Sequence, residues 1–202
     1  QFVVAGTVLG FGIACLLGAR FGADGYSMLN DGVATALDAE FLLVNVAISA
    51  AFVAVGWIAG QVPGIGTIGI PLVVGAAVSL FERVVPEPDA MAARIGLFVG
   101  GFALMVLAVA AYLGTNLGVG PAEAPPLAFD ERVPFRWSYG AVQVGGALIG
   151  WMLGSPIGAG TVAVVVLIGL TITFIAISTH IGRVLFGAPP TQPAPTNQRS
   201  WA

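Results

Sequence analysis

The chain has 202 residues, of which 57% are hydrophobic and only 8% are charged, whereas charged residues make up about 25% of an average soluble domain. So few charges cannot cover the surface of a soluble protein of this size, and we predict that lipid surrounds most of the chain. The seven cationic side chains are all arginines and the net charge is -3, so the lack of a basic stripe argues against nucleic acid as a partner.

A disulfide, a Cys/His zinc site and a bis-histidine haem site are excluded within one chain, because Cys15 is the only cysteine and His180 the only histidine. We therefore expect no cofactor and no metal. Cys15 is interpreted as a small apolar residue of the first span, and His180 as an interfacial residue near the end of the last. An enzyme is not expected, because the sequence has no Ser/His/Asp set with a deep histidine and no pair of deep aspartates.

Apolar runs long enough to cross about 30 Å of hydrocarbon recur along the chain. The first is long enough to span, so we expect a transmembrane helix there and not a cleaved signal peptide. The sequence predicts an all-α, polytopic membrane protein with about six transmembrane helices. The runs lie near Phe2–Gly18, Phe41–Ala59, Ile65–Phe81, Ile95–Leu113, Trp137–Leu153 and Gly158–Ile181.

The runs divide into two groups of three. Short connections, Gly60–Gly64 and Gly154–Ile157, join the last two runs of each group, so each pair is predicted to form an antiparallel hairpin. Long segments, Ala19–Glu40 and Thr115–Arg136, follow the first run of each group. We expect a first repeat over residues 1–93, a second over 94–186, and a Pro-rich extended tail over 187–202.

The two groups also match residue by residue. Both copies contain Gly-x-Gly-Thr, with a further glycine eight positions after the threonine. Because three spans are an odd number, the second copy enters the membrane from the opposite side, and the repeat is predicted to be inverted. The matching segments are Leu17–Gly22 with Leu113–Gly118, Trp57–Gly60 with Trp151–Gly154, and Gly64–Thr67 with Gly158–Thr161.

A short broken or re-entrant helix is expected in each half. In the first half, apolar positions recur at near-helical spacing up to Leu37, and the helix is predicted to start at Asp24 or Gly25. In the second half, Pro121 suits the first turn of the counterpart helix. If both helices dip into the bilayer, their positive ends point at the protein centre. The sequence leaves open whether residues 24–37 and 121–131 enter the bilayer or lie on it.

These segments resemble the YczE/YyaS/YitT family of bacterial integral membrane proteins. The family pattern is roughly Gly-Leu-Gly-Pro-Trp-Asp-Val-Leu-x-x-Gly-Leu, followed after the next span by Gly-x-Gly-Thr. In the first copy Ser27 stands at the position of the family acid and Gly25 replaces proline, while Glu123 keeps an acid in the second copy. The resemblance implies a fold more than an activity. Its matching residues are Gly22, Tyr26, Met28, Leu29, Gly32, Val33, Gly118, Gly120, Pro121, Glu123, Gly64–Thr67 and Gly158–Thr161.

Other polar residues fall at matching places in the two copies. Counting back from the tryptophans, Asn45 corresponds to Tyr139 and Ser49 to Gln143, which would place them on faces that meet the Gly-x-Gly-Thr turns. They predict a substrate pocket between the repeats. The alternative is interhelical hydrogen bonds worth about 0.6 to 2 kcal/mol each. The candidate substrate-binding residues are Arg20, Ser27, Asn45, Ser49, Thr67, Asn116, Glu123, Tyr139, Gln143 and Thr161.

Two charged sets have simpler interpretations. Arg20 and Asp24 lie four residues apart, and the alternative to a site role for Arg20 is a pairing of these two side chains. The remaining acidic residues are expected in loops, where water or headgroups solvate them. They are Asp31, Asp38, Glu40, Glu82, Glu87, Asp89, Asp130 and Glu131.

Two functions fit these observations. The first is a transporter or channel for a small polar or anionic solute, with its site at the repeat interface. The second is a non-catalytic accessory subunit of a larger membrane complex. In either case lipid is the main partner, and a homo-oligomer or a larger complex stays open. Four arginines on one side against three on the other favour cytoplasmic termini, and the resemblance implies the bacterial cytoplasmic (inner) membrane.

Overall fold

The computed structural model describes residues 1–113, 118–130, 132–164 and 166. All of these residues belong to one compact unit, Gln1–Gly169, and the second unit, Leu170–Ala202, lies outside the described residues. The regular elements of the described part are all α-helices, which confirms the all-α prediction. They are α1 (Phe2–Gly18), α2 (Gly25–Leu37), α3 (Phe41–Ile58), α4 (Ile65–Phe81), α5 (Met91–Leu113), α6 (Ala124–Ala128) and α7 (Phe135–Met152).

The apolar runs and the helices agree closely. Helices α1 and α4 have the predicted bounds, α3 ends one residue earlier, and α5 begins at Met91, ahead of the predicted Ile95. Residues 159–164 begin a further helix, but most of the sixth predicted run lies outside the described residues. Cys15 is buried in α1, as expected.

Two of the described helices are long and apolar enough to cross a membrane, namely α3 and residues Met91–Val109 of α5. Helices α1 and α4 are apolar but have 17 residues each. The apolar helices also expose large side chains, such as Leu43 and Leu107, both about two-thirds exposed. Exposed aliphatic side chains on apolar helices indicate a lipid-facing surface.

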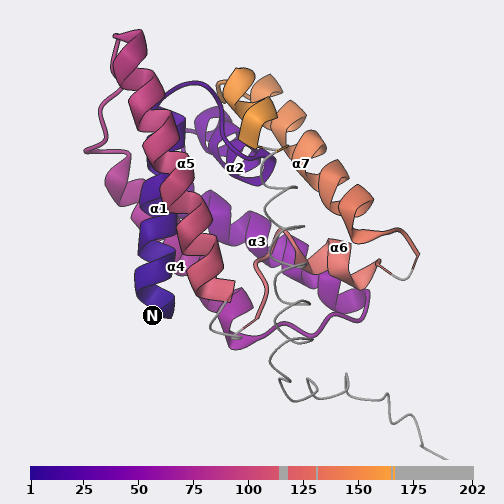
Figure 1. The fold of residues 1–202 in the computed structure, drawn as a ribbon. Coiled ribbons are helices and arrows are strands. Elements are labelled where there is room, and N and C mark those ends of the chain that lie inside the picture. Colours follow the sequence, from indigo (N-terminus) through magenta and orange to yellow (C-terminus); the bar gives the residue numbers. More distant parts are fainter. Residues whose placement is uncertain (114–117, 131, 165, 167–202) are drawn as a thin grey trace, which may run out of the picture. The chain divides into compact units, whose positions relative to one another are not determined.

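Helix α1 packs against both α4 and α5 through glycines (Figure 1). A side chain on Gly10 would lie 2.5 Å from the β-carbon of Ala77 in α4, and one on Gly12 would lie 2.9 Å from the carbonyl oxygen of Gly101 in α5. Such close backbone approach maximises van der Waals contact where lipid removes the hydrophobic effect. The glycines of α1 therefore form the packing surfaces of this helix.

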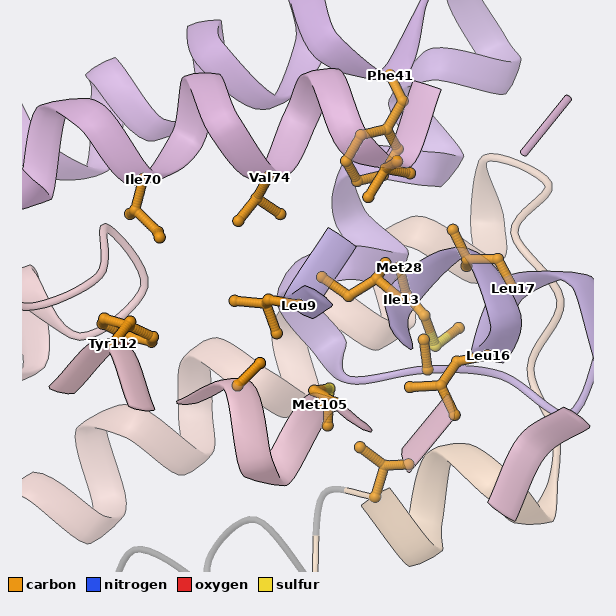
Figure 2. Packing of buried hydrophobic residues seen from close by; sticks show 14 of the residues in the cluster. Leu9, Ile13, Leu16, Leu17, Met28, Phe41, Ile70, Val74, Met105 and Tyr112 are labelled. Atoms are coloured by element: carbon orange, nitrogen blue, oxygen red, sulfur yellow. The ribbon is translucent and has the colours of Figure 1, made fainter. Parts of the chain in front are cut away.

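The core joins these helices to α2. Figure 2 shows Leu9 and Ile13 of α1 near Met28 of α2, with Met105 of α5 and Val74 of α4 in the same cluster. Met28 is fully buried, so the short helix α2 is anchored in the apolar core.

The two short helices each pack on a long helix that is distant in the sequence. Helix α2 packs against α7, and α6 packs against α3. At the first contact Gly32 faces the backbone of Gly150 so closely that a side chain on Gly32 would overlap it. At the second contact, a side chain on Gly56 would lie 3.0 Å from the carbonyl carbon of Ala124.

Three details differ from the predictions. Helix α2 begins at the predicted place, but Asp31 lies within it and not in a loop. Pro121 lies in the turn before α6 and does not open that helix, which begins with Pro125 and Pro126 in its first turn. The short helices also differ in length, 13 residues against 5, because two consecutive prolines remove the N–H groups that would extend α6.

Candidate functional site

Gln143 of α7 links that helix to the start of α2. Its side-chain oxygen accepts a 2.6 Å hydrogen bond from the backbone N–H of Gly25. Its side-chain nitrogen donates a 2.8 Å hydrogen bond to the hydroxyl of Tyr139, one turn away. Both side chains are buried. The glycine at position 25 is required here, because a β-carbon would overlap the Gln143 backbone.

Tyr26 links α2 to α3. Its hydroxyl lies 2.6 Å from the hydroxyl of Ser49, and its backbone carbonyl accepts a 2.7 Å hydrogen bond from the Asn30 side chain. Asn30 is fully buried, and its side-chain oxygen has no hydrogen-bond partner among the described residues. The site residues predicted from the sequence include Ser49 but not Tyr26 or Asn30.

Asn45 links α3 to α4. Its side chain donates a 2.8 Å hydrogen bond to the carbonyl oxygen of Pro71 in α4. Both helices belong to the same three-helix group, so Asn45 joins α3 to its hairpin partner.

The two Gly-x-Gly-Thr turns lie against the segments that follow α1 and α5. A β-carbon on Gly22 would overlap the hydroxyl of Thr161, and one on Gly118 would lie 2.6 Å from the hydroxyl of Thr67. Gly22 and Gly118 both have positive φ, +89° and +133°, which glycine adopts without strain. Thr161 also donates a 3.3 Å hydrogen bond to the Met28 sulfur. Both threonines are buried, and each lies against the glycine of the segment that contacts it.

Asp24 and Ser27 form the start of α2. Asp24 is the N-cap, and one of its carboxylate oxygens accepts a 3.1 Å hydrogen bond from the Ser27 backbone N–H. Asp24 is only 8% exposed, and its other carboxylate oxygen has no hydrogen-bond partner among the described residues. Glu123 precedes α6 as its N-cap and makes no side-chain capping hydrogen bond there. The sequence pointed to Ser27 and Glu123 but missed Asp24 as a site residue.

Arg20 lies apart from this cluster. Its guanidinium is 2.8 Å from the Glu87 carboxylate, and both side chains are more than 60% exposed. The alternative pairing of Arg20 with Asp24 is therefore not formed, and Glu87 is the partner of Arg20. The cause is the left-handed conformation of Arg20, with φ of +55°, which breaks the helical register that an i,i+4 pair requires. Asn116, the remaining predicted residue, lies outside the described residues.

A cavity of about 440 Å³ lies elsewhere, between residues of α1, α2 and α4 and the segments that follow α2 and α4. Arg83 on its wall pairs with Glu40 at 2.7 Å. Burial and the nearby Asp31 carboxylate raise the pKa of Glu82 to about 7. In the described part of the chain, no group of three or more His, Cys, Asp or Glu side chains is placed to hold a metal ion. The carboxylates that line the cavity are Asp31, Asp38, Glu40, Glu82 and Glu87.

Comparison with known proteins places the chain in a family. Residues 1–177 match the family described as "Family of unknown function (DUF6198)". The chain belongs to the DUF6198 family. An "Uncharacterized membrane protein YczE" from Bacillus subtilis (strain 168) is 25% identical over 114 residues, covering 55% of this chain and 53% of the relative. The chain thus matches about half the length of that protein.

A second relative covers more of the chain. An "Uncharacterized protein" from Haemophilus influenzae is 24% identical over 172 residues, covering 83% of this chain and 78% of the relative. No solved structure matches. The DUF6198 match and the B. subtilis relative confirm the resemblance to YczE-like membrane proteins. The B. subtilis protein is named a membrane protein, and a membrane location for this DUF6198 chain agrees with its apolar helices.

Proposed function

We propose that the chain is a multi-pass transporter or channel of the bacterial cytoplasmic membrane, with its termini in the cytoplasm. It acts on a small polar solute bound where two inverted three-helix repeats meet. The observation that carries this proposal is the reciprocal packing of the short helices, α2 on α7 and α6 on α3. We propose no catalytic role.

The reciprocal contacts support an inverted repeat. If residues 1–93 and 94–186 are related by a twofold axis, a contact of α2 with α7 requires a matching contact of α6 with α3, and both are present. The same axis would exchange the contact of Gly22 with Thr161 and the contact of Gly118 with Thr67. An axis of this kind in the membrane plane is the plan of many secondary transporters.

Helix length supports the re-entrant interpretation of α2. With 13 residues, it is about 20 Å long and too short to cross about 30 Å of hydrocarbon. Its buried residues contact α7, α3 and the α1 core, and its first residue, Gly25, is buried whereas its last, Leu37, is exposed, so it would begin inside the protein and reach the surface at its C-terminal end. Non-helical backbone at membrane depth is tolerated where protein or a water-filled cavity surrounds it.

Polar side chains gather where α2 packs on α7 and on α3, although helix packing within a lipid bilayer does not require them. Polar side chains at membrane depth are rare and mark substrate or ion pathways. The bonded amides and hydroxyls could also be structural. Three buried side-chain oxygens of the described residues, on Asp24, Asn30 and Ser155, have no hydrogen-bond partner. The two on Asp24 and Asn30 distinguish the interior around α2 from a purely structural one. They favour a solute that donates hydrogen bonds.

An anionic solute fits less well than a neutral or cationic one. The N-terminal N–H groups of α2 are already used, because Gly25 donates to Gln143 and Ser27 donates to Asp24. Arg20 pairs with Glu87 at the surface. Both features that favoured an anion from the sequence are thus occupied by other contacts.

One observation favours the alternative function, a non-catalytic accessory subunit of a larger membrane complex. Gln143 bonds to the Tyr139 hydroxyl and to the Gly25 backbone N–H, and Tyr26 bonds to Ser49. These hydrogen bonds are what a dry, structural interface would show. Purification in mild detergent with mass spectrometry of co-purifying chains separates the two functions. We expect the protein alone or as a homo-oligomer, and stoichiometric larger subunits would overturn the transporter proposal.

Flux into proteoliposomes tests transport directly. Neutral, cationic and anionic small solutes would be compared, with Gln143→Leu as the site variant and the exposed Glu87→Gln as its matched control. We expect uptake of a neutral or cationic solute that Gln143→Leu reduces and Glu87→Gln leaves unchanged. Equal uptake by empty liposomes for every solute would contradict the proposal.

A further inference from the structure

We propose that the cavity among α1, α2 and α4 binds a small organic dication of the alkyl diamine class. The carboxylates of Asp31, Asp38 and Glu82 hold its ammonium groups. The inference goes beyond the proposed function, because the cavity is a separate place in the fold. Its lining residues lie between Ala14 and Glu87, within the first predicted repeat, whereas the proposed solute site lies where the two repeats meet.

The cavity has the size of a small-molecule site and lies at the ends of the long helices. Its volume is about 440 Å³, and small-molecule sites have about 300 to 1,000 Å³. Gly18 ends α1, Glu82 follows α4 and Phe41 begins α3, and all three residues line the cavity. Because spanning helices begin and end near the membrane surface, a solute dissolved in water can reach this cavity.

The cavity wall carries more carboxylates than arginines. Arg83 on the wall pairs with Glu40 at 2.7 Å, and Arg20 pairs with Glu87 at 2.8 Å. The carboxylates of the wall that form no ion pair with a described residue are those of Asp31, Asp38 and Glu82. The cavity therefore has an excess of negative charge, which raises the local concentration of cations.

The spacing of the carboxylates favours an organic cation over a metal ion. In the described part of the chain, no three acidic, cysteine or histidine side chains are placed to hold one metal ion, whereas hard metal ions need several oxygen ligands around one point. A ligand for carboxylates that do not converge must carry its positive charges on separate atoms. An alkyl diamine has this property, because it has an ammonium group at each end.

The uncharged part of the wall suits the methylene groups of such a ligand. Leu17 and Phe41 line the cavity and belong to the buried apolar core (Figure 2). Methylene groups that leave water for an apolar surface contribute to binding, and a hydrated metal ion would gain nothing from the same surface. An apolar wall with a few polar groups that fix orientation is typical of small-molecule sites.

Isothermal titration calorimetry of the purified full chain in mild detergent tests the proposal. The probe is putrescine, an alkyl diamine, titrated at constant ionic strength. Butylamine has the same chain with one charge, butanediol has no charge, and magnesium chloride supplies a dication without methylene groups. We expect saturable binding of putrescine, weaker binding of butylamine, and no binding of butanediol or magnesium.

Charge-removing variants assign the binding to the cavity. Asp31→Asn and Asp38→Asn each remove one charge with little change of shape, and asparagine tolerates the left-handed φ of +50° at residue 38. Each variant should weaken putrescine binding about fivefold, because one charge pair with the ligand is lost. Asp89→Asn is the matched control, since Asp89 is an exposed acid that does not line the cavity, and it should bind putrescine as the wild type does.

Putrescine binding should strengthen as pH rises through about 7. Burial and the Asp31 carboxylate raise the pKa of Glu82 to about 7, so this carboxyl becomes ionised while the amines, with an ordinary pKa of about 10, stay charged. Glu82→Gln should bind putrescine more weakly and without this rise. The other charged groups on the cavity wall are Asp31, Asp38, Glu40, Arg83 and Glu87.

Three results would overturn the proposal: no binding of putrescine, equal binding of magnesium, or equal weakening by Asp89→Asn and by the cavity variants. The last two would indicate an unspecific acidic surface. Putrescine binding without flux of any solute would remove the transporter function and leave the cavity site intact. Flux of a solute without putrescine binding would remove the cavity site and leave the transporter.

Discussion

Gly22 lies directly against the hydroxyl of Thr161, although the two residues are far apart in the chain. Gly118 lies in the same way against Thr67. In each case the segment after a long helix contacts the Gly-x-Gly-Thr turn of the other half. These contacts leave no room for a side chain, so they can be tested by adding one methyl group.

Gly22→Ala should destabilise the protein by about 2 to 4 kcal/mol. The positive φ at residue 22 costs a side chain about 1 kcal/mol, and overpacking against Thr161 adds about 1 to 3 kcal/mol. Gly60→Ala is the matched control, because Gly60 also has positive φ but has open space around it. Its cost should stay near about 1 kcal/mol.

Unfolding in denaturant or by heat measures these differences. The double variant Gly22→Ala/Thr161→Ala should recover part of the loss, because it removes the overlapping hydroxyl. Equal destabilisation by Gly22→Ala and Gly60→Ala would show that the contact with Thr161 is not tight.

Gln143→Leu should cost about 1 to 3 kcal/mol, because it leaves the buried N–H of Gly25 without an acceptor. Tyr139→Phe should cost less, since it removes only the acceptor of the Gln143 amide. The free energy of unfolding of both variants and of the double variant checks the coupling. If the free-energy losses of the two single variants simply add in the double variant, Gln143 and Tyr139 do not belong to one hydrogen-bond network.

Tyr26→Phe and Ser49→Ala should each cost about 1 kcal/mol, because each leaves one buried hydroxyl without its partner. The double variant should be less destabilised than the sum of the two, since both hydroxyls are then absent. A double-mutant cycle measured by unfolding gives the coupling energy between them. A coupling energy of zero would mean that the two hydroxyls do not interact across α2 and α3.

Stability should fall as pH rises towards and through about pH 7. The pKa of Glu82 is raised from its ordinary value of 4.5 to about 7, so the folded protein binds a proton that the unfolded chain releases between these values. The stabilisation is complete below the unfolded pKa and is lost as pH rises through the folded one.

The Glu82→Gln variant should lack this part of the pH dependence, and Asp31→Asn should reduce it, because Asp31 is the charged neighbour that raises the pKa. Melting temperatures at a series of pH values measure the effect. An unchanged slope in Glu82→Gln would assign the pH dependence to another group.

The sequence by itself determined the local elements. The apolar runs predicted the bounds of α1 and α4 because charged or turn-forming residues flank them, and Asp24 predicted the start of α2 because its short side chain can cap a helix. The internal matches also pointed to Thr67 and Thr161, both of which are buried. Periodicity and capping act over a few residues, so they can be recognised in one segment.

Only the tertiary structure decided which elements meet. The packing of α2 on α7 brings Gly25 to Gln143 across 118 positions, and that of α2 on α3 brings Tyr26 to Ser49. Arg20 could be assigned to Asp24 from spacing, yet it pairs with Glu87, 67 positions away. Asp24 and Asn30 appeared as ordinary polar residues of a short helix until burial left an oxygen on each without a partner. Burial and partnership between distant segments depend on how helices pack, and hydrophobic periodicity carries no information about which partner a helix face selects.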